Sequence, residues 1–125
     1  MTVTSNEAAE NAVLRVCQYT LIQPGMRKRY RELHDNSWPG VLDRIRKSNF
    51  RNYTIFLRGD MLVQYYEYVG TDFDADLAAM QADPESQRWW LETGPCQLDP
   101  EPHLPGGPWR DFAPMWRLED FPVGS

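Results

Sequence analysis

Two strand-like segments joined by a short turn constrain the fold of this chain most. Residues 52–57 (NYTIFL) and 61–69 (MLVQYYEYV) are rich in β-branched and aromatic side chains, and residues 58–60 between them include a glycine. Runs of this composition, separated by a short glycine-containing turn, are typical of antiparallel hairpins. The sequence therefore predicts a β-hairpin over residues 52–69, and the other elements have to be arranged around it.

A strand and an interrupted helix precede the hairpin. Residues 13–22 mix β-branched and aromatic side chains and stop before Pro24, which predicts a strand. Pro39 removes a backbone donor and disfavours a helical conformation at Trp38, so we expect two helical pieces or a kink at 35–39. The helical region itself is indicated by apolar residues at mostly helical spacing: Met26, Tyr30, Leu33, Val41, Leu42 and Ile45.

Two helices, a long loop and a last strand are expected after the hairpin. Residues 72–83 are predicted to be helical, with Asp72 or Thr71 as the cap, and a second helix begins at Pro84 and ends before Gly94-Pro95. Residues 94–108 hold five of the ten prolines and three glycines, which indicates a loop. Residues 110–121 look extended, and Pro114 restricts them to an edge or a bulge.

The resulting order, β-α-β-β-α-(α)-loop-β, predicts an α+β, ferredoxin-like fold with helices on one face of an antiparallel sheet. Several large side chains of residues 63–69 would be exposed on the face of the sheet opposite the helices, and packing against a second copy of the protein is the simplest way to bury them. We therefore expect a two-fold homodimer with the sheets face to face, a dimeric α/β barrel. The chain length favours one domain over residues 12–125, after a polar and mobile arm at residues 1–11.

Composition argues against several classes of function. With 13 Lys and Arg against 18 Asp and Glu, the net charge is −5, which does not favour binding to nucleic acid. No stretch approaches the roughly 18 apolar residues of a membrane span. The polar N-terminus lacks the features of a signal peptide, so Cys17 and Cys96 are expected to be reduced thiols in a cytoplasmic protein. We found no phosphate-binding loop, nucleophile triad or metal-ligand spacing, so neither a cofactor nor a metal is predicted.

A stripe of aromatic residues on the first helix is the first candidate for chemistry. Tyr30, His34 and Trp38 are four residues apart, so they share one side of the helix. A histidine with a pKa of about 6.5 is suited to proton transfer near neutrality, although a lone histidine is more often a surface or capping residue. The spacing alone favours a core position for Tyr30, and we expect Trp38 to have a packing role.

Three further candidates lie downstream. Trp89 and Trp90 point about 100° apart on a helix, so they cannot fill the same hole. One can serve the core while the other lines a cavity suited to a sugar, both can border such a cavity, or both are core residues. Tyr53 begins a predicted strand, where its hydroxyl can reach the mouth of a pocket. Glu67, if buried, needs a partner such as an arginine, or helps to orient a site residue. His103 lies in the proline-rich loop and is expected to be exposed.

Together these residues resemble a known family. The pattern Y30-x3-H34-x3-W38-P39, then NY at 52–53 and QRWW at 87–90, is similar to the L-rhamnose mutarotase family over roughly residues 13–93. The resemblance implies a small dimeric α+β barrel that interconverts the α and β pyranose anomers of a deoxy-sugar without a cofactor. It also implies the site: His34 as the catalytic proton donor, with Tyr30, Tyr53, Trp89 and Trp90 as sugar contacts.

The chemistry of mutarotation agrees with such a site. Ring opening removes the proton of the anomeric hydroxyl and protonates the ring oxygen, and groups that titrate near pH 7 do this without a metal or nucleotide. We expect His34 to be the acid, and Tyr30, Tyr53 or a bound water to be the base. The loop at 94–110 looks longer than the family pattern, so L-fucose or another 6-deoxy or pentose sugar is a possible substrate. The alternatives are a cofactor-free monooxygenase or ligand binder of the same fold, or a purely structural domain.

Overall fold

The structure is a computed structural model that describes residues 13–124. The strands are β1 (Leu14–Ile22), β2 (Phe50–Arg58), β3 (Met61–Tyr68), β4 (Gln97–Leu98) and β5 (Arg110–Asp111). The helices are α2 (Arg27–Asp35), α3 (Pro39–Lys47), α4 (Phe73–Ala82) and α5 (Pro84–Thr93), with 3₁₀ turns η1 (Gly94–Cys96) and η2 (Leu118–Asp120). The predicted arm at residues 1–11 lies outside the described part, and its separation from a single domain over 12–125 stays a prediction.

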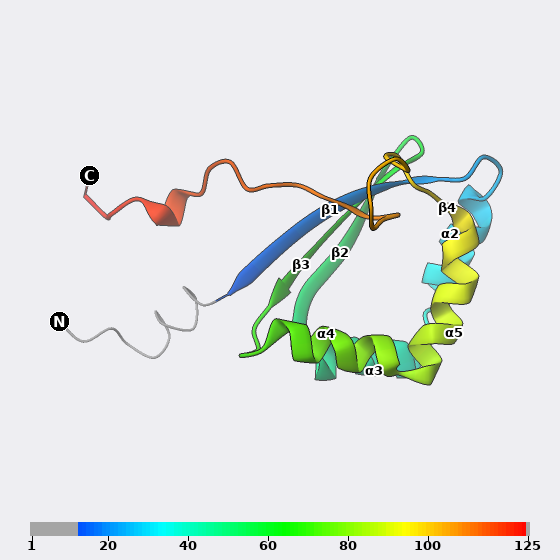
Figure 1. Ribbon diagram of the computed structural model, residues 1–125, viewed down its shortest axis with the longest axis horizontal. Coiled ribbons are helices and arrows are strands. Elements are labelled where there is room, and N and C mark those ends of the chain that lie inside the picture. The colour runs from blue at the N-terminus through cyan, green and yellow to red at the C-terminus, as the bar shows by residue number, and fades with distance from the viewer. Residues whose placement is uncertain (1–12, 125) are drawn as a thin grey trace.

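The sheet has the ferredoxin-like order. Its strands run β2-β3-β1-β4, and the short β5 also pairs with β1, next to β4. Every pairing is antiparallel. The four helices gather on one face of this curled sheet (Figure 1). The predicted fold class is therefore confirmed.

The hairpin is longer than predicted, because β2 begins at Phe50. The two strands pair from Phe50 opposite Tyr68 to Arg58 opposite Met61, and Gly59 in the turn has a φ of 59°. The guanidinium of Arg27 donates to the Gly59 carbonyl at 2.6 Å and to Asp60 at 2.8 Å. These contacts attach the start of α2 to the turn of the hairpin.

The helix boundaries follow the local signals. α2 ends at Asp35 and α3 begins at Pro39, with Trp38 extended at φ −74° and ψ 127°, so the predicted interruption is confirmed. Asp72 caps α4 by accepting from the Ala75 amide at 3.1 Å, and Asp83 caps α5 in the same way. Each cap satisfies an amide that the first turn of a helix leaves without a partner.

The buried core lies between the helices and the inner face of the sheet. Tyr66 and Tyr68 lie on this inner face, where they pack with Phe50 and Met80. The expectation that several large side chains of residues 63–69 lie on the uncovered face is wrong for Tyr66 and Tyr68. Strand residues alternate between the two faces, so only the odd-numbered positions of this stretch, such as Tyr65, lie on the outer face.

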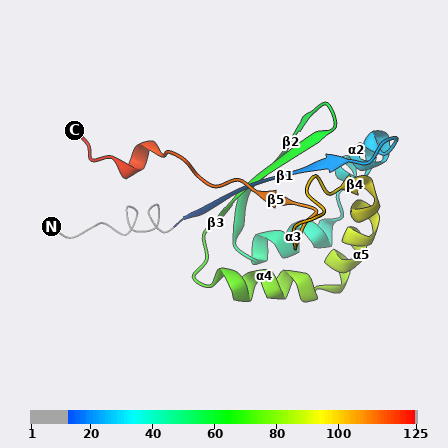
Figure 2. The same cartoon turned by 45° about the horizontal axis from the view of Figure 1, so that its top comes forward.

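The C-terminal segment pairs over a much shorter length than predicted. Only Arg110–Asp111 forms a strand, and the Phe112 amide makes the next bond, to the Cys17 carbonyl at 2.8 Å. Pro114 follows shortly, and it has no amide to continue the ladder. The chain then runs away from the body (Figures 1 and 2), with Met115 95% exposed. No helix in residues 13–124 is both long and apolar enough to cross a membrane.

Candidate functional site

A cavity of about 740 Å³ lies between the helices and β2, at the inner face of the sheet. His34 from α2, Trp89 from α5 and Tyr53 from β2 contribute to its wall. Val41, Leu42 and Ile45 of α3 supply apolar side chains, whereas Arg46, Arg51 and Asn52 supply polar ones. Three candidate residues that lie far apart in the sequence, on α2, β2 and α5, therefore line the same cavity.

His34 is held in a defined state by its neighbours. Its Nδ1 lies 2.8 Å from the Tyr30 carbonyl oxygen. A carbonyl only accepts, so Nδ1 carries the hydrogen, and Nε2 is the nitrogen left to exchange a proton. Burial lowers the pKa of His34 below its usual 6.5, against the opposing effects of this hydrogen bond and of Asp35. The resting ring at pH 7 is therefore neutral, with Nε2 as an acceptor.

The two candidate tyrosines differ in position. Tyr30 is 6% exposed and belongs to the core, with its ring 4.2 Å from that of His34. It lines a second cavity of about 540 Å³, whose wall shares His34 and Ile55 with the first. Tyr53 is 38% exposed, and its hydroxyl donates to Gln64 Oε1 at 2.5 Å. Burial raises the pKa of Tyr30 to about 12 and also raises the pKa of Tyr53, so both are neutral phenols.

A β-bulge gives Tyr53 its orientation. The register of the hairpin shifts between Arg51 and Thr54, and Asn52 there has a φ of 52°. The extra residue reverses the alternation of the strand, so that Tyr53 lies on the inner face. The Asn52 amide donates to Glu67 Oε1 at 2.7 Å, which fixes the bulge to the neighbouring strand.

The two adjacent tryptophans are in different environments. Trp89 is 8% exposed, and its ring lies edge-on to those of His34 and Trp38, 5.3 Å from each. Trp38 thus packs against Trp89, in line with its expected role. Trp90 is 40% exposed and lines neither of the two cavities above. The structure brings together Tyr30, His34, Tyr53 and Trp89, and leaves Trp90 apart.

Other residues singled out in the sequence lie away from these cavities. Glu67 is half-buried and accepts from Tyr65 as well as Asn52, and these bonds lower its pKa. His103 is exposed, as expected. Among residues 13–124, no group of three or more His, Cys, Asp and Glu side chains could hold a metal ion.

Sequence reasoning missed two glutamines near Tyr53. Gln64 is 6% exposed on the inner face of β3, directly opposite Gln18 of β1. The signal was available in the alternation, because Gln64 lies between the apolar inward positions Leu62 and Tyr66. A polar side chain at a buried position needs a partner, so it marks a hydrogen-bond network.

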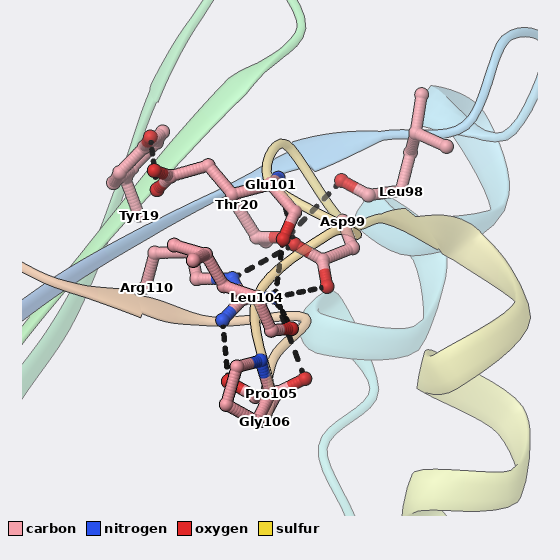
Figure 3. Close-up of polar contacts among 9 residues, drawn as sticks. All are labelled: Tyr19, Thr20, Leu98, Asp99, Glu101, Leu104, Pro105, Gly106 and Arg110. Atoms are coloured by element: carbon pink, nitrogen blue, oxygen red, sulfur yellow. Dashed lines mark hydrogen bonds and ion pairs between the residues drawn. The ribbon is translucent and has the colours of Figure 1, made fainter.

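The long loop is built around a single arginine (Figure 3). The guanidinium of Arg110, 8% exposed, makes a two-point contact with Asp99 at 2.9 and 2.7 Å. It also donates to the carbonyls of Glu101, Leu104 and Pro105, at 2.6 to 2.9 Å. The contact raises the pKa of Arg110 and lowers that of Asp99. One side chain thus satisfies several carbonyls of a loop without regular structure.

This loop lies against β1 and the core. Tyr19 donates to Glu101 Oε2 at 2.9 Å, and Thr20 to the Leu98 carbonyl at 3.4 Å (Figure 3). Trp109 packs against the core cluster that contains Tyr30. Residues 94–110 supply none of the wall of either cavity described here. The loop therefore contacts the residues behind the site rather than the cavity itself.

The sequence model of the L-rhamnose mutarotase family matches residues 15–118. This chain belongs to that family. The L-rhamnose mutarotase of Burkholderia cenocepacia is 30% identical over 104 residues, which cover 78% of this chain and 91% of the relative. The L-rhamnose mutarotase of Opitutus terrae is 29% identical over 94 residues, 75% of this chain and 81% of the relative.

Solved structures agree on the fold of this mutarotase-family chain. The crystal structure of an L-rhamnose mutarotase from Formosa agariphila superimposes with a TM-score of 0.63 at 18% identity, covering 84% of this chain and 98% of that one. A putative antibiotic biosynthesis monooxygenase from Nitrosomonas europaea gives 0.53 at 14% identity, covering 70% and 82%. At these identities the likeness concerns the fold alone, and the family assignment rests on the sequence.

Proposed function

We propose that this protein is an aldose mutarotase, an isomerase that interconverts the α and β pyranose anomers of L-rhamnose without a cofactor. Its membership of the L-rhamnose mutarotase family gives the reaction class. The observation that carries the proposal is a neutral histidine, His34, in the wall of a cavity of about 740 Å³ next to Trp89 and Tyr53. A volume of this order lies in the usual range for small-molecule sites.

The wall of the cavity suits a 6-deoxy-sugar. Trp89 and Ile55 offer apolar surface for the C–H face of a pyranose ring, and Val41 and Leu42 offer it for a methyl group at C6. Arg46 can bond to the ring hydroxyls. A free monosaccharide has this same division into apolar faces and polar edges, which supports a sugar over an aromatic hydrocarbon.

In the proposed reaction, His34 carries one proton. Neutral Nε2 accepts the proton of the anomeric hydroxyl as the C1–O5 bond breaks, and the imidazolium then donates that proton to O5. After rotation about C1–C2, O5 attacks the other face of the aldehyde and the two proton transfers run in reverse. The raised pKa values of Tyr30 and Tyr53 make these phenols poor bases, so they are better suited to bonding the sugar as neutral hydroxyls.

We also propose that the protein acts as a cytoplasmic homodimer. On the outer face of the sheet, Phe56 is 57% exposed and Met61 is 39% exposed. Trp116 in the C-terminal segment is 61% exposed, so a second copy has apolar surface to cover. Both cysteines, Cys17 and Cys96, are free, which suits a reducing compartment.

The test is to dissolve a single anomer of L-rhamnose and follow its approach to equilibrium by polarimetry or saturation-difference NMR. We expect the protein to accelerate exchange well above the buffer rate, and His34→Ala to lose most of this acceleration. L-Fucose and a pentose should be run in parallel, because faster exchange with either would reassign the substrate within the same reaction. If none of these sugars exchanges faster than in buffer, the proposed function is wrong.

A further inference from the structure

Three hydrogen bonds form a continuous chain across the sheet, from the candidate site to the C-terminal strand. The Tyr53 hydroxyl donates to Gln64 Oε1 at 2.5 Å, and Gln64 Nε2 donates to Gln18 Oε1 at 2.6 Å. Gln18 Nε2 in turn donates to Asp111 Oδ1 at 2.7 Å. The chain thus connects β2, β3, β1 and β5, which are neighbours in that order.

Asp111 gives this chain its direction. A carboxylate only accepts hydrogen bonds, so Gln18 has to present its amide NH₂ to Asp111. The oxygen of Gln18 then faces Gln64, which has to present its own NH₂. The oxygen of Gln64 is left to face Tyr53, and this requires the tyrosine hydroxyl to donate. With any other orientation of an amide, two acceptors or two donors would meet.

The direction decides how Tyr53 meets a ligand. Its single hydroxyl hydrogen is engaged by Gln64, so the phenol oxygen can only accept from a group in the cavity. We propose that Asp111, through Gln18 and Gln64, orients the Tyr53 hydroxyl as a hydrogen-bond acceptor for a sugar hydroxyl, so that the three are positioning residues for substrate binding. This inference rests on the proposed mutarotase function.

The surroundings support a defined network. Gln64 is 6% exposed, and leaving its amide unbonded there would be costly, so it holds its two bonds. Tyr66 lies beside the chain, with its ring 5.3 Å from that of Tyr53, and burial and the charge of Asp111 raise its pKa to about 12. Arg110, the residue before Asp111, points its guanidinium at Asp99 instead. Among the described residues, Arg110 therefore does not compete with Gln18 for the Asp111 carboxylate.

A double-mutant cycle on sugar binding tests the proposal. We expect Asp111→Ala to raise the KM for L-rhamnose about 3- to 10-fold, the range for one net hydrogen bond, with little change in kcat. In a Tyr53→Phe background, the same substitution should change KM by less than about 2-fold, because the group it orients is gone. Asp111→Asn should raise KM less than Asp111→Ala does, since the asparagine carbonyl oxygen still accepts a hydrogen bond from Gln18.

Glu119→Ala is the matched control, because it removes an exposed carboxylate of the C-terminal segment that takes no part in the hydrogen-bond network. It should leave KM unchanged. An equal rise in KM for Asp111→Ala with and without the Tyr53 hydroxyl would overturn the proposal, as would no rise in the wild-type background. All variants should first show the melting temperature and size-exclusion profile of the wild type.

A second readout needs no sugar and separates this inference from the proposed function. In the free protein, Asp111→Ala should shift the side-chain amide NMR signals of Gln64 as well as those of Gln18, and Tyr53→Phe should shift those of Gln18. Shifts confined to the directly bonded neighbour would overturn the chain even in an active enzyme. If the amide signals shift along the whole network but the protein accelerates anomer exchange of none of the sugars, the proposed function is rejected and the network is retained.

Discussion

At the scale of a single residue, the protonation state of His34 decides what the candidate site can do. Its ring is enclosed by Tyr30 and Trp89, and its Nδ1 hydrogen is engaged by a backbone carbonyl in the same helix. Both features act on one nitrogen, Nε2. Enclosure favours the neutral ring, and the carbonyl ensures that the free lone pair is on Nε2.

This state predicts the pH dependence of the reaction. If the neutral ring starts the cycle, kcat/KM should be level above pH 6.5 and should fall at lower pH, with a midpoint below 6.5 because burial lowers the pKa of His34. Exchange of L-rhamnose anomers by NMR at each pH, after subtraction of the buffer rate, measures this. His34→Gln should slow the reaction about 10²- to 10⁴-fold and abolish the acidic limb. A rate that instead falls as the pH rises from 6 to 7 would show that the protonated ring is the starting form.

At the scale of an element, β2 depends on one residue with an unusual backbone. Asn52 has a positive φ, which glycine adopts freely and which asparagine tolerates better than most residues that carry a side chain. The bulge there reverses the alternation of the strand and moves Tyr53 to the inner face. One backbone conformation therefore separates a surface tyrosine from a site tyrosine.

Substitutions at Asn52 should test this dependence. Asn52→Val is expected to lower the free energy of unfolding by about 1–2 kcal/mol, because a β-branched residue is strained in this region. It should also raise KM as Tyr53 is misplaced. Asn52→Gly is the matched control: it allows the same φ and loses only the bond to Glu67, so it should keep most of the sugar binding. Urea unfolding and anomer-exchange kinetics give the two quantities, and equal losses of binding in both variants would contradict the role of the bulge.

At the scale of the whole molecule, the outer face of the sheet and the C-terminal segment lack cover from the described residues. The helices occupy the opposite face, and the segment after Phe112 runs away from the body (Figure 2). Phe56, Met61 and Trp116 are all more than a third exposed. Apolar surface of this kind usually marks an interface between proteins.

A dimer through the outer face predicts twice the chain mass of 14.6 kDa in light scattering coupled to size exclusion. Phe56→Glu should shift the protein towards the monomer, since it places a charge in the middle of the proposed interface. Leu91→Glu is the comparison variant, because Leu91 is 75% exposed on α5, away from the outer face of the sheet, and should leave the mass unchanged. A monomeric wild type, or equal effects of both substitutions, would rule out this interface.

Local patterns in the sequence were sufficient for the hairpin, the helices and most of the site, but not for the short β4, which lies in the predicted loop, or for the length of the last strand. The hairpin around Gly59, the interruption before Pro39 and the cap at Asp72 depend on neighbouring residues only, and all were predicted. The motif residues Tyr30, His34, Tyr53 and Trp89 were also named from the sequence, and they lie around two cavities that share His34. Their roles in catalysis and binding stay predictions.

Tertiary structure alone decided which faces these residues occupy. A strand pattern has a period of two, but the packing of the helices determines which set of positions is covered, and this put Tyr66 and Tyr68 in the core. A single-residue bulge then turned Tyr53 inward. Strand pairing brought Gln18 and Asp111, which are 93 residues apart in the sequence, into the hydrogen-bond network that reaches Tyr53. The sequence by itself determined the fold class, the family and the choice of His34 as the candidate for proton transfer, because these depend on local spacing. The orientation of Tyr53 depends on contacts between distant strands, which form only when the sheet is assembled.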